Sequence, residues 1–362
     1  MSDPVLQSLI EQVRTARSER TLLDIRGGSS KAFYGGVARG QALDVAALRG
    51  ISSYEPSELV VTVRAGTPLV ELEDALAAQG QCLPFEPPRF APQGTVGGMV
   101  AAGLAGPARA AVGGVRDYVL GAAVLNGRAE LLNFGGTVMK NVAGYDAARS
   151  LVGSMGVLGV ICEVSLKVLP VAPAKLSLRL ELGQADAIRR VNEWGGQALP
   201  LNASAWWDGM LVLRLAGAVA AVSSAARKLG GEVIEADLAS TFWSGLRDHR
   251  DEFFLGAVKA VDGGANLWRL SVPATTLPLK MSGEQLLEWG GAQRWICTSA
   301  PAAGLRESAA AAGGHAVLFR GGDKSAGIFA PLKPPLDRIQ RELKRAFDPD
   351  GIFNPDRLYP GW

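Results

Sequence analysis

The chain has 362 residues, of which 48% are apolar and 20% are charged, and its 37 basic residues outnumber its 35 acidic residues by only two. This length exceeds a single typical core, so two domains are expected, and the composition argues against extensive disorder. A formal net charge of +2 gives no electrostatic basis for binding nucleic acid.

Cysteine and histidine are too sparse for a metal centre. Cys82, Cys162 and Cys297 are 80 and 135 positions apart, and His249 and His315 are 66 positions apart. Zinc and iron–sulfur sites take their ligands at close spacing. We therefore predict no metal, and any redox cofactor should be organic.

No segment has the pattern of a membrane span or a signal peptide. Residues 5–13 space their apolar side chains as an amphipathic helix does, with Asp3 and Glu11 on its other face. The longest apolar stretch elsewhere, residues 99–105, is interrupted by glycine and ends before Pro107, whereas a membrane helix needs roughly 20 apolar residues. We expect a cytoplasmic protein with no intrinsic membrane span.

A first glycine-rich turn, residues 26–31 (RGGSSK), follows a short strand expected at residues 22–25. Successive backbone N–H groups in such a turn, together with serine hydroxyls, can form a concavity for an anion such as a pyrophosphate. The same residues also suit a plain turn. The turn alone therefore does not decide between the two interpretations.

A strand followed by a helix precedes the second glycine-rich turn. Residues 58–64 are rich in β-branched side chains, and Thr67-Pro68 begins a helix that presents leucines on one face and ends at Gly80. A proline-rich segment, residues 82–88, then leads into the turn at residues 91–98 (APQGTVGG). The order indicates a β-α unit that carries the turn.

The third glycine-rich segment, residues 135–161, is the longest. It follows a hairpin predicted at Asn126-Gly127, a pair that favours tight two-residue turns. Its glycines at 153, 156 and 159 lead into a strand whose side chains alternate over residues 160–168, which places Cys162 in a core. These glycines suit either a tight structural crossing or a close approach of main chain to a flat or anionic ligand. We favour a flavin site, because three such turns occur in one half of the chain.

Beyond residue 172 the order of predicted elements changes. Residues 176–235 read strand, helix, strand, strand, helix, strand, which is the split β-α-β arrangement, with a hairpin at Asp208-Gly209. Residues 267–320 repeat this pattern in part, with a second hairpin around Gly290-Gly291. We therefore predict two related units that share one sheet.

In order and spacing, the three turns resemble the FAD-binding domain of the vanillyl-alcohol oxidase type of flavoproteins, also called the PCMH type, over residues 5–172. Residues 347–355 are similar to the C-terminal end of FAD-linked oxidases. Several segments also resemble the FAD-binding subunits of bacterial glycolate oxidases. These segments are residues 83–88, 138–146, 246–254, 288–295 and 314–322.

The resemblance implies an α+β fold in which a two-subdomain FAD-binding domain spans residues 1–172 and a cap spans residues 173–332. The cap would hold one antiparallel sheet built from two βαββαβ-like units. Residues 333–362 would form a C-terminal helix and a tail that returns to the FAD-binding domain.

The resemblance also implies FAD bound without a covalent link, since residues 26–31 contain neither histidine nor cysteine. The pyrophosphate would lie against residues 27–30 and 94–98, and residues 156–161 would contact the flavin or adenine end. The predicted cofactor-binding residues are Arg26, Gly27, Gly28, Ser29, Ser30, Pro92, Gln93, Gly94, Thr95, Val96, Gly97, Gly98, Ala102, Gly103, Gly144, Tyr145, Asp146, Gly156, Val157, Gly159, Val160 and Ile161.

Oxidation of a 2-hydroxy acid needs a cation for the carboxylate, a base for the hydroxyl proton and a flavin to take the hydride. Arg247 or Arg320 could bind the carboxylate, and His249 or His315 could be the base. Arg247 and His249 could equally lie on a solvated helix surface. Related D-2-hydroxy-acid dehydrogenases hold a metal with histidine ligands over the flavin, and this chain departs from them because His315 is alone in the corresponding strand.

The resemblance implies that the chain is the FAD-binding subunit of a glycolate oxidase or dehydrogenase complex. Such a complex oxidises glycolate to glyoxylate, and its flavin passes the electrons to an iron–sulfur subunit. Two versions remain open. The chain turns over the small 2-hydroxy acid itself, or it is a non-catalytic assembly or electron-relay subunit beside a sister FAD-binding catalytic subunit. The alternative is a standalone FAD-dependent oxidase of another alcohol or a sugar. Any association with a membrane would come through the complex.

Overall fold

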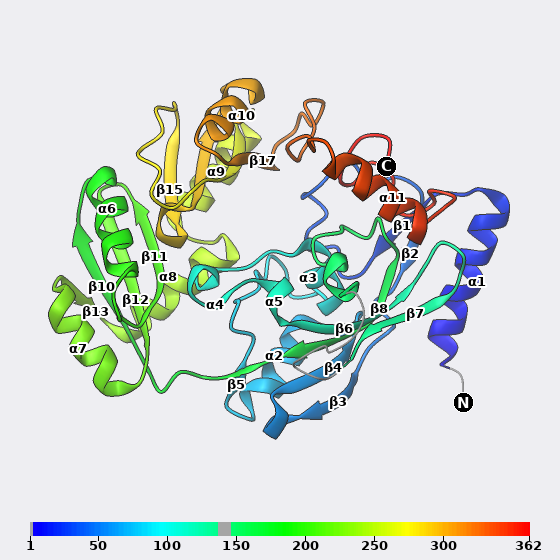
Figure 1. Ribbon diagram of the computed structural model, residues 1–362, viewed down its shortest axis with the longest axis horizontal. Helices are drawn as coiled ribbons and strands as arrows, with labels where there is room; N and C mark the ends of the chain where they lie inside the picture. The colour runs from blue at the N-terminus through cyan, green and yellow to red at the C-terminus, as the bar shows by residue number, and fades with distance from the viewer. Residues whose placement is uncertain (1–2, 137–145) are drawn as a thin grey trace.

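The computed structural model describes residues 3–136 and 146–362. Two antiparallel sheets organise the chain, and they lie in different parts of the molecule (Figure 1). Residues 3–136 and 146–170 form the N-terminal part around a five-stranded sheet, and residues 174–320 form the cap around an eight-stranded sheet.

Both parts contain helices and strands in mixed order. In chain order, the N-terminal part contains α1 (Pro4–Glu19), β1 (Leu23–Arg26), β2 (Gln41–Asp44), β3 (Ile51–Glu55), η1 (Pro56–Glu58), β4 (Val60–Arg64), α2 (Leu69–Ala77), β5 (Gln81–Cys82), α3 (Val96–Ala102), α4 (Arg109–Val112), α5 (Val115–Tyr118), β6 (Val119–Leu125), β7 (Leu131–Gly135), η2 (Ala148–Leu151), β8 (Val160–Lys167) and β9 (Leu169–Pro170). The cap and the C-terminal segment contain β10 (Ala174–Glu181), α6 (Gln184–Gly195), β11 (Leu201–Trp207), β12 (Met210–Gly217), α7 (Val219–Leu229), β13 (Glu232–Ile234), α8 (Ala236–Asp248), α9 (Glu252–Asp262), β14 (Asn266–Ser271), β15 (Glu284–Glu288), η3 (Trp289–Gly291), β16 (Gln293–Thr298), α10 (Ala302–Ala311), β17 (His315–Arg320) and α11 (Leu336–Phe347).

The five-stranded sheet has the order β3-β4-β8-β6-β7, with β8 at its centre. Val164 and Leu166 of β8 are fully buried, as the alternating pattern predicts. Ser165, expected to face outward, is also buried, because its hydroxyl pairs with that of Thr62 on β4 at 2.9 Å. Cys162 lies in the core as predicted, and burial raises the pKa of its thiol to about 12.

The connection between β6 and β7 differs from the predicted two-residue turn. Asn126 N donates to Glu130 O at 3.0 Å, so the loop is longer, and Ala129 (φ 60°) rather than Gly127 takes the left-handed conformation. Gly127 instead donates its N–H to Phe347 O of α11 at 2.9 Å. The Asn-Gly pair therefore serves as a docking point for the C-terminal helix, and a tight turn would prevent that contact.

The strand order of the cap confirms two related units in one sheet. The sheet runs β13-β10-β12-β11-β15-β16-β14-β17, and all its neighbours are antiparallel. The first unit contains β10 to β13 and the second contains β14 to β17, and the strands of each can be numbered 1 to 4 in chain order. Across the sheet, the first unit then has the order 4-1-3-2 and the second has the order 2-3-1-4. The units are thus mirrored about the β11–β15 pairing. They differ in one connection, because α6 follows the first strand of unit one whereas residues 272–283 of unit two contain no helix.

The C-terminal tail pairs with the first strand of the chain. Leu23 N donates to Ile352 O at 2.7 Å, and Asn354 N donates to Leu23 O at 2.9 Å. The buried Lys344 of α11 donates to Val157 O at 2.7 Å, which fixes the tail to the third glycine-rich segment.

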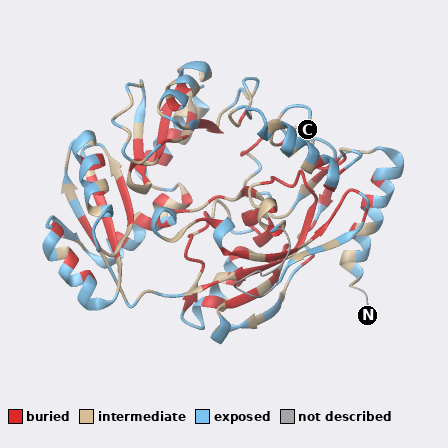
Figure 2. Cartoon of the chain, viewed as in Figure 1, coloured by how far each residue is buried: buried red, intermediate tan, exposed pale blue. Residues whose placement is uncertain are grey.

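The largest group of buried apolar residues joins the two parts. It includes Tyr34, Ala102 and Met155 from the N-terminal part, and Trp268 and Phe319 from the cap. Figure 2 shows buried residues concentrated in the strands of both sheets and exposed residues on the outer helices. In the described ranges, no helix combines the length and the apolar composition that crossing a membrane requires.

Candidate functional site

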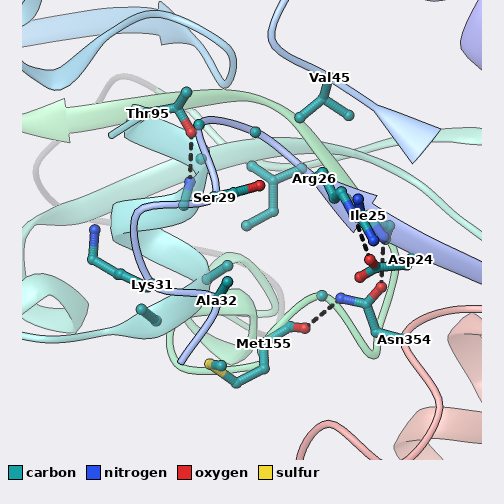
Figure 3. Close-up of a pocket in the computed structure, with 18 of the residues that line it drawn as sticks. Asp24, Ile25, Arg26, Ser29, Lys31, Ala32, Val45, Thr95, Met155 and Asn354 are labelled. Carbon is teal, nitrogen blue, oxygen red and sulfur yellow. Dashed lines mark hydrogen bonds and ion pairs between the residues drawn. The ribbon is translucent and has the colours of Figure 1, made fainter. Parts of the chain in front are cut away.

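Three glycine-rich turns surround one cavity of about 350 Å³ in the N-terminal part (Figure 3). Residues 26–31 follow β1, residues 95–98 begin α3, and residues 155–161 lead into β8. The tail contributes Asn354 and Arg357 to the lining. Segments from both ends and from the middle of the sequence therefore meet at this first cavity.

The first and second turns are in direct contact, which only glycine permits. A Cβ atom on Gly28 would lie 1.5 Å from the carbonyl oxygen of Gln93, and a Cβ atom on Gly27 would lie 2.5 Å from Oγ1 of Thr95. Thr95 also caps α3, because its Oγ1 accepts a hydrogen bond from Gly98 N at 3.2 Å. A side chain at residue 27 or 28 would therefore push the two turns apart.

Asn354 of the tail connects β1 to the third segment (Figure 3). Its Oδ1 accepts a hydrogen bond from Ile25 N at 2.7 Å, and its Nδ2 donates to Met155 O at 2.7 Å. A Cβ atom on Gly156 (φ 78°) would lie 2.4 Å from this Nδ2, and one on Gly159 would lie 2.7 Å from a carbonyl oxygen of β6. Both glycines also line the cavity, so they serve a tight crossing and leave main chain open to a ligand.

Positive charges exceed negative charges around the first cavity. Burial lowers the pKa of Lys31 to about 8, and its ammonium lies within 4.0 Å of no carboxylate among the described residues. Arg357 donates to backbone carbonyl oxygens, including that of Tyr34 at 2.8 Å, and burial lowers its pKa. Arg26 pairs with Asp24, the only acidic side chain of the described chain in this lining. An elongated anion such as a dinucleotide would satisfy the remaining positive charge.

The structure brings some of the predicted cofactor-binding residues to this cavity. Those that line it are Arg26, Gly27, Gly28, Ser29, Ser30, Thr95, Gly97, Gly98, Ala102, Gly156, Gly159 and Ile161. Those that do not are Pro92, Gln93, Gly94, Val96, Gly103, Asp146, Val157 and Val160. Gly144 and Tyr145 lie outside the described residues. Val96, Val157 and Val160 lie in the apolar core. Val96 in α3 and Val160 in β8 point there because neighbouring residues of a helix or strand face different directions.

Sequence reasoning missed further residues of the lining. These are Asp24, Ile25, Lys31, Ala32, Ala38, Val45, Ala101, Met155, Asn354 and Arg357. Lys31 closes the first turn, and Asn354 belongs to the segment 347–355 that resembles FAD-linked oxidases, so both carried a local signal. Arg357 carried none, because its position depends on the packing of the tail against Tyr34.

A second cavity of about 490 Å³ lies between the N-terminal part and the cap. Its polar and aromatic lining residues are Arg109, Arg269, Ser271, Trp289 and His315. Arg269 lies on β14 and His315 begins the neighbouring β17, directly opposite Ser271. Desolvation, together with the charge of Arg269, lowers the pKa of His315 below its usual value, so this imidazole is neutral near pH 7.

The two cavities are adjacent. Ala102 lines the first cavity, and the next residue, Gly103, lines the second. Tyr34 also connects them, because its carbonyl oxygen accepts a hydrogen bond from Arg357 and its hydroxyl accepts one from Nη2 of Arg269 at 3.2 Å. A ligand in the first cavity could therefore extend toward the second.

Of the four candidate catalytic residues, only His315 lines either cavity. His249 ends α8 with φ 55° and stacks on Phe254, with ring centroids 3.6 Å apart. Burial, with Arg320 and Arg269 nearby, lowers the pKa of His249 far below its usual value. Arg320 stacks over the ring of Phe33, 3.9 Å from its centroid.

Arg247 and His249 do not lie on the solvated helix surface that was one interpretation of the sequence. Arg247 makes two hydrogen bonds of 2.8 Å to Asp248, and Asp248 is buried and also accepts from Arg89 N at 2.8 Å. The aromatic packing of His249 likewise half-buries it. Among the described residues, no group of three or more histidine, cysteine, aspartate or glutamate side chains could hold a metal ion.

Comparisons with known proteins point to flavoproteins. The family described as FAD binding domain matches residues 6–146. Over 353 residues the chain is 47% identical to the glycolate oxidase subunit GlcE of Escherichia coli (strain K12), which covers 98% of this chain and 97% of that protein. It is 29% identical over 181 residues to the glycolate oxidase subunit GlcD of Bacillus subtilis (strain 168), which covers 49% of this chain and 38% of that protein.

The fold has a counterpart among solved structures. Alkyldihydroxyacetonephosphate synthase matches with a TM-score of 0.67 at 13% identity, over 96% of this chain and 74% of that one. Together with the FAD binding domain, this likeness confirms the expected α+β fold, a PCMH-type domain with an antiparallel cap.

Proposed function

The chain belongs to the family of the glycolate oxidase subunit GlcE and is an FAD-dependent 2-hydroxy-acid oxidoreductase, and from this premise we propose that it is the FAD-binding subunit of a complex that oxidises glycolate to glyoxylate. The observation that carries the proposal is the meeting of three glycine-rich turns at the first cavity. A sister FAD-binding subunit and an iron–sulfur subunit would complete the complex.

The exposed main chain and the charge of the first cavity support the binding of FAD there. Gly27 and Gly28 leave main chain exposed where a Cβ atom would collide, and Lys31 and Arg357 supply positive charge that no carboxylate of the described chain neutralises within 4.0 Å. In this proposal, residues 27–30 and 97–98 hold the pyrophosphate, and residues 156–161 contact the flavin or adenine end. Neither histidine nor cysteine lies in residues 26–31, so the cofactor would be held without a covalent bond there.

The second cavity, next to the first, would admit the substrate. Oxidation of glycolate removes a hydride from carbon and a proton from the hydroxyl group, and bound FAD supplies the hydride acceptor. His315 at this cavity would accept the hydroxyl proton, because its lowered pKa keeps it neutral near pH 7. Ser271 lies opposite His315 in the sheet and would help to orient it.

Electrons from the reduced cofactor would leave through a partner. Cys82, Cys162 and Cys297 belong to β5, β8 and β16, and their sequence spacing does not suit an iron–sulfur cluster. An iron–sulfur subunit is therefore the proposed acceptor, and any attachment to a membrane would come through that complex.

A spectroscopic experiment tests the proposed function. The purified chain should show flavin absorption, and anaerobic glycolate should bleach it, either alone or after the partner subunits are added. Bleaching that needs a partner would favour an electron-relay role over direct turnover. A colourless preparation that takes up no added FAD would contradict the proposal. A steady yield of hydrogen peroxide from the isolated chain with another alcohol or a sugar would favour a standalone oxidase.

A further inference from the structure

The second cavity concentrates positive charge that forms no salt bridge with a carboxylate of the described residues. Arg109 and Arg269 both line it, and within the described ranges no carboxylate oxygen lies within 4.0 Å of either guanidinium. Arg109 comes from α4 of the N-terminal part, and Arg269 comes from β14 of the cap. The cavity therefore brings together cations from both sides of the junction.

Arg269 is the less exposed of the two arginines, and its hydrogen bonds are incomplete. Its Nη2 donates to the hydroxyl of Tyr34 at 3.2 Å, but its buried Nε has no hydrogen-bond partner in the described chain. The guanidinium also lies near the ring of Phe319, 6.0 Å from its centroid. A buried donor without a partner is costly, so an acceptor brought by a ligand would be favoured here.

Arg109 is exposed at the rim and is held in place by an aromatic ring. Its guanidinium lies 4.6 Å from the centroid of Trp289, and Trp289 is itself fixed by a hydrogen bond from its Nε1 to Gly106 O at 3.1 Å. Asp117 is the acidic residue whose charge acts on Arg109, but its Oδ2 accepts from Gly114 N at 2.8 Å. The planar guanidinium is thus oriented without an ion pair.

The backbone of β14 and the start of β17 pack closely beside these groups. A Cβ atom on Gly314 would lie 2.0 Å from the carbonyl oxygen of Ser271, so the start of β17 can approach β14 only with glycine there. His315 follows immediately and lies at the cavity. The site thus offers two guanidinium groups for an anion and one neutral imidazole for a hydroxyl group.

We propose that the second cavity is a carboxylate-binding site in which Arg269 of the cap and Arg109 of the N-terminal part bind the carboxylate of a small 2-hydroxy acid. This assignment rests on the proposed function for the identity of the acid, but the carboxylate chemistry follows from the two unpaired guanidiniums. Arg269 is the main ligand, because it is less exposed than Arg109 and its Nε has no acceptor in the described chain. Arg109 contributes less, because its charge is partly screened by solvent. Arg247 and Arg320 are not ligands, since neither lines the cavity.

Oxalate is a suitable probe, because it carries carboxylates but has no alcohol to oxidise. Its dissociation constant is measured by isothermal titration calorimetry on the full-length, FAD-loaded protein. Arg269→Met should weaken oxalate binding about tenfold or more, as expected for a lost charge-assisted hydrogen bond, and Arg109→Met should weaken it about two- to fivefold. Arg190→Met is the matched control, because Arg190 also stacks near a tryptophan, 6.0 Å from the ring of Trp194, but lies outside both cavities.

The outcomes separate this inference from the proposed function. If oxalate binds with the expected dependence on Arg269 and Arg109 but glycolate never reduces the flavin, the site stands and the proposed function fails. If glycolate is oxidised with an unchanged KM in Arg109→Met, Arg269→Met and the wild type, the carboxylate site is wrong although the function stands. Arg109→Met keeps the test usable even if Arg269→Met fails to fold, because Arg109 is exposed. Absence of oxalate binding to folded wild-type protein at millimolar concentration would also overturn the inference.

Discussion

Lys31 is the residue whose ionisation most directly affects the first cavity. It lines the cavity, and burial lowers its pKa to about 8. In the proposed FAD site the charged form would attract the pyrophosphate, so we predict that FAD affinity falls as the pH rises through about 8. Fluorescence titration of the FAD-free protein on either side of this pH measures the effect. Lys31→Arg should remove the pH dependence, because a guanidinium stays charged, and Lys31→Met should weaken FAD binding roughly tenfold at neutral pH.

The same lysine should destabilise the FAD-free protein. Its folded-state pKa of about 8 lies below its ordinary value of 10.5, so the unfolded chain binds more protons between these values and stability rises with pH across this window. Below about pH 8 the buried lysine is charged, so the free energy of unfolding is lowered by the full cost of burying that charge. Lys31→Met should therefore raise the Tm of the FAD-free protein at pH 7 while it weakens FAD binding. A Tm that falls instead would show that the ammonium has a structural role.

Gly28 is the position where the contact between two turns leaves least space. A methyl group there would overlap the carbonyl oxygen of Gln93, at 1.5 Å. We predict that Gly28→Ala destabilises the protein by about 1–3 kcal/mol and abolishes retention of FAD during purification. Urea unfolding and the flavin-to-protein absorbance ratio measure the two effects.

Gly304 supplies the matched control. It lies inside α10, and a Cβ atom there would meet nothing within 4 Å. Gly304→Ala should leave FAD content unchanged and stabilise the helix by about 0.5–1 kcal/mol. Equal behaviour of the two alanine variants would contradict the role assigned to Gly28.

Two Asx-Gly pairs show how an element depends on its surroundings. Asp208 (φ 45°) and Gly209 (φ 79°) form the predicted tight turn between β11 and β12, and both take the left-handed conformation. The pair Asn126-Gly127 does not, because Oδ1 of Asn126 accepts hydrogen bonds from Arg128 N and Glu130 N, both at 2.9 Å. Gly127 packs against α11 instead. Local sequence predicted a turn at both sites, and a distant helix decided the type of one.

Glu288, at the end of β15, makes cap stability depend on pH. Its carboxyl group accepts hydrogen bonds from Trp295 Nε1 at 2.6 Å and Gln293 Nε2 at 2.8 Å. Burial, with smaller effects of Asp251 and Glu86, raises its pKa to about 7 from 4.5. Between pH 4.5 and 7 the folded chain therefore binds more protons than the unfolded chain does. The contribution of Glu288 to the free energy of unfolding is complete below pH 4.5 and is lost as the pH rises through 7. We predict that this contribution lowers the wild-type Tm from about pH 5 to about pH 8 relative to that of Glu288→Gln.

Glu288→Gln should flatten this profile, because the amide does not titrate. A small slope should remain, since burial also raises the pKa of Asp251 to about 6. Glu307→Gln, on the exposed face of α10, should keep the wild-type profile. Thermal melts followed by circular dichroism supply the measurement, and an unchanged slope in Glu288→Gln would assign the pH dependence to another group.

At the scale of the whole molecule, the C-terminal tail is part of the cofactor-binding half. Asn354 is buried and bonds both Ile25 N and Met155 O, so it holds two of the three glycine-rich segments together. We predict that Asn354→Ala lowers the free energy of unfolding by about 2–3 kcal/mol and weakens FAD binding. Asp350→Ala, which removes an exposed pair with Arg17, should cost under about 1 kcal/mol. A variant Asn354→Ala that binds FAD normally would contradict this coupling.

The division of the molecule into domains follows from these contacts and remains our proposal. Residues 1–172 would form the FAD-binding domain, residues 173–332 the cap, and residues 333–362 would complete the first domain from the far end of the chain. The shared apolar cluster and the second cavity lie where the two domains meet.

The sequence by itself determined the type and order of many of the elements, because periodicity, β-branched content and turn chemistry act over a few residues. It predicted α2 and the cap strands, and it placed Arg26 to Ser30, Thr95 and Gly156 in turns that the structure brings to one cavity. These predictions needed no knowledge of distant contacts.

Only the tertiary structure decided which side chains share a cavity. Arg357 reaches the first cavity because the tail pairs with Leu23, more than 300 positions earlier. Arg109 and Arg269 face one space because α4 lies against the cap, and His249 is withdrawn from it by aromatic packing. Burial, charge pairing and access to a ligand depend on long-range contacts, and a local pattern in the sequence does not predict such contacts.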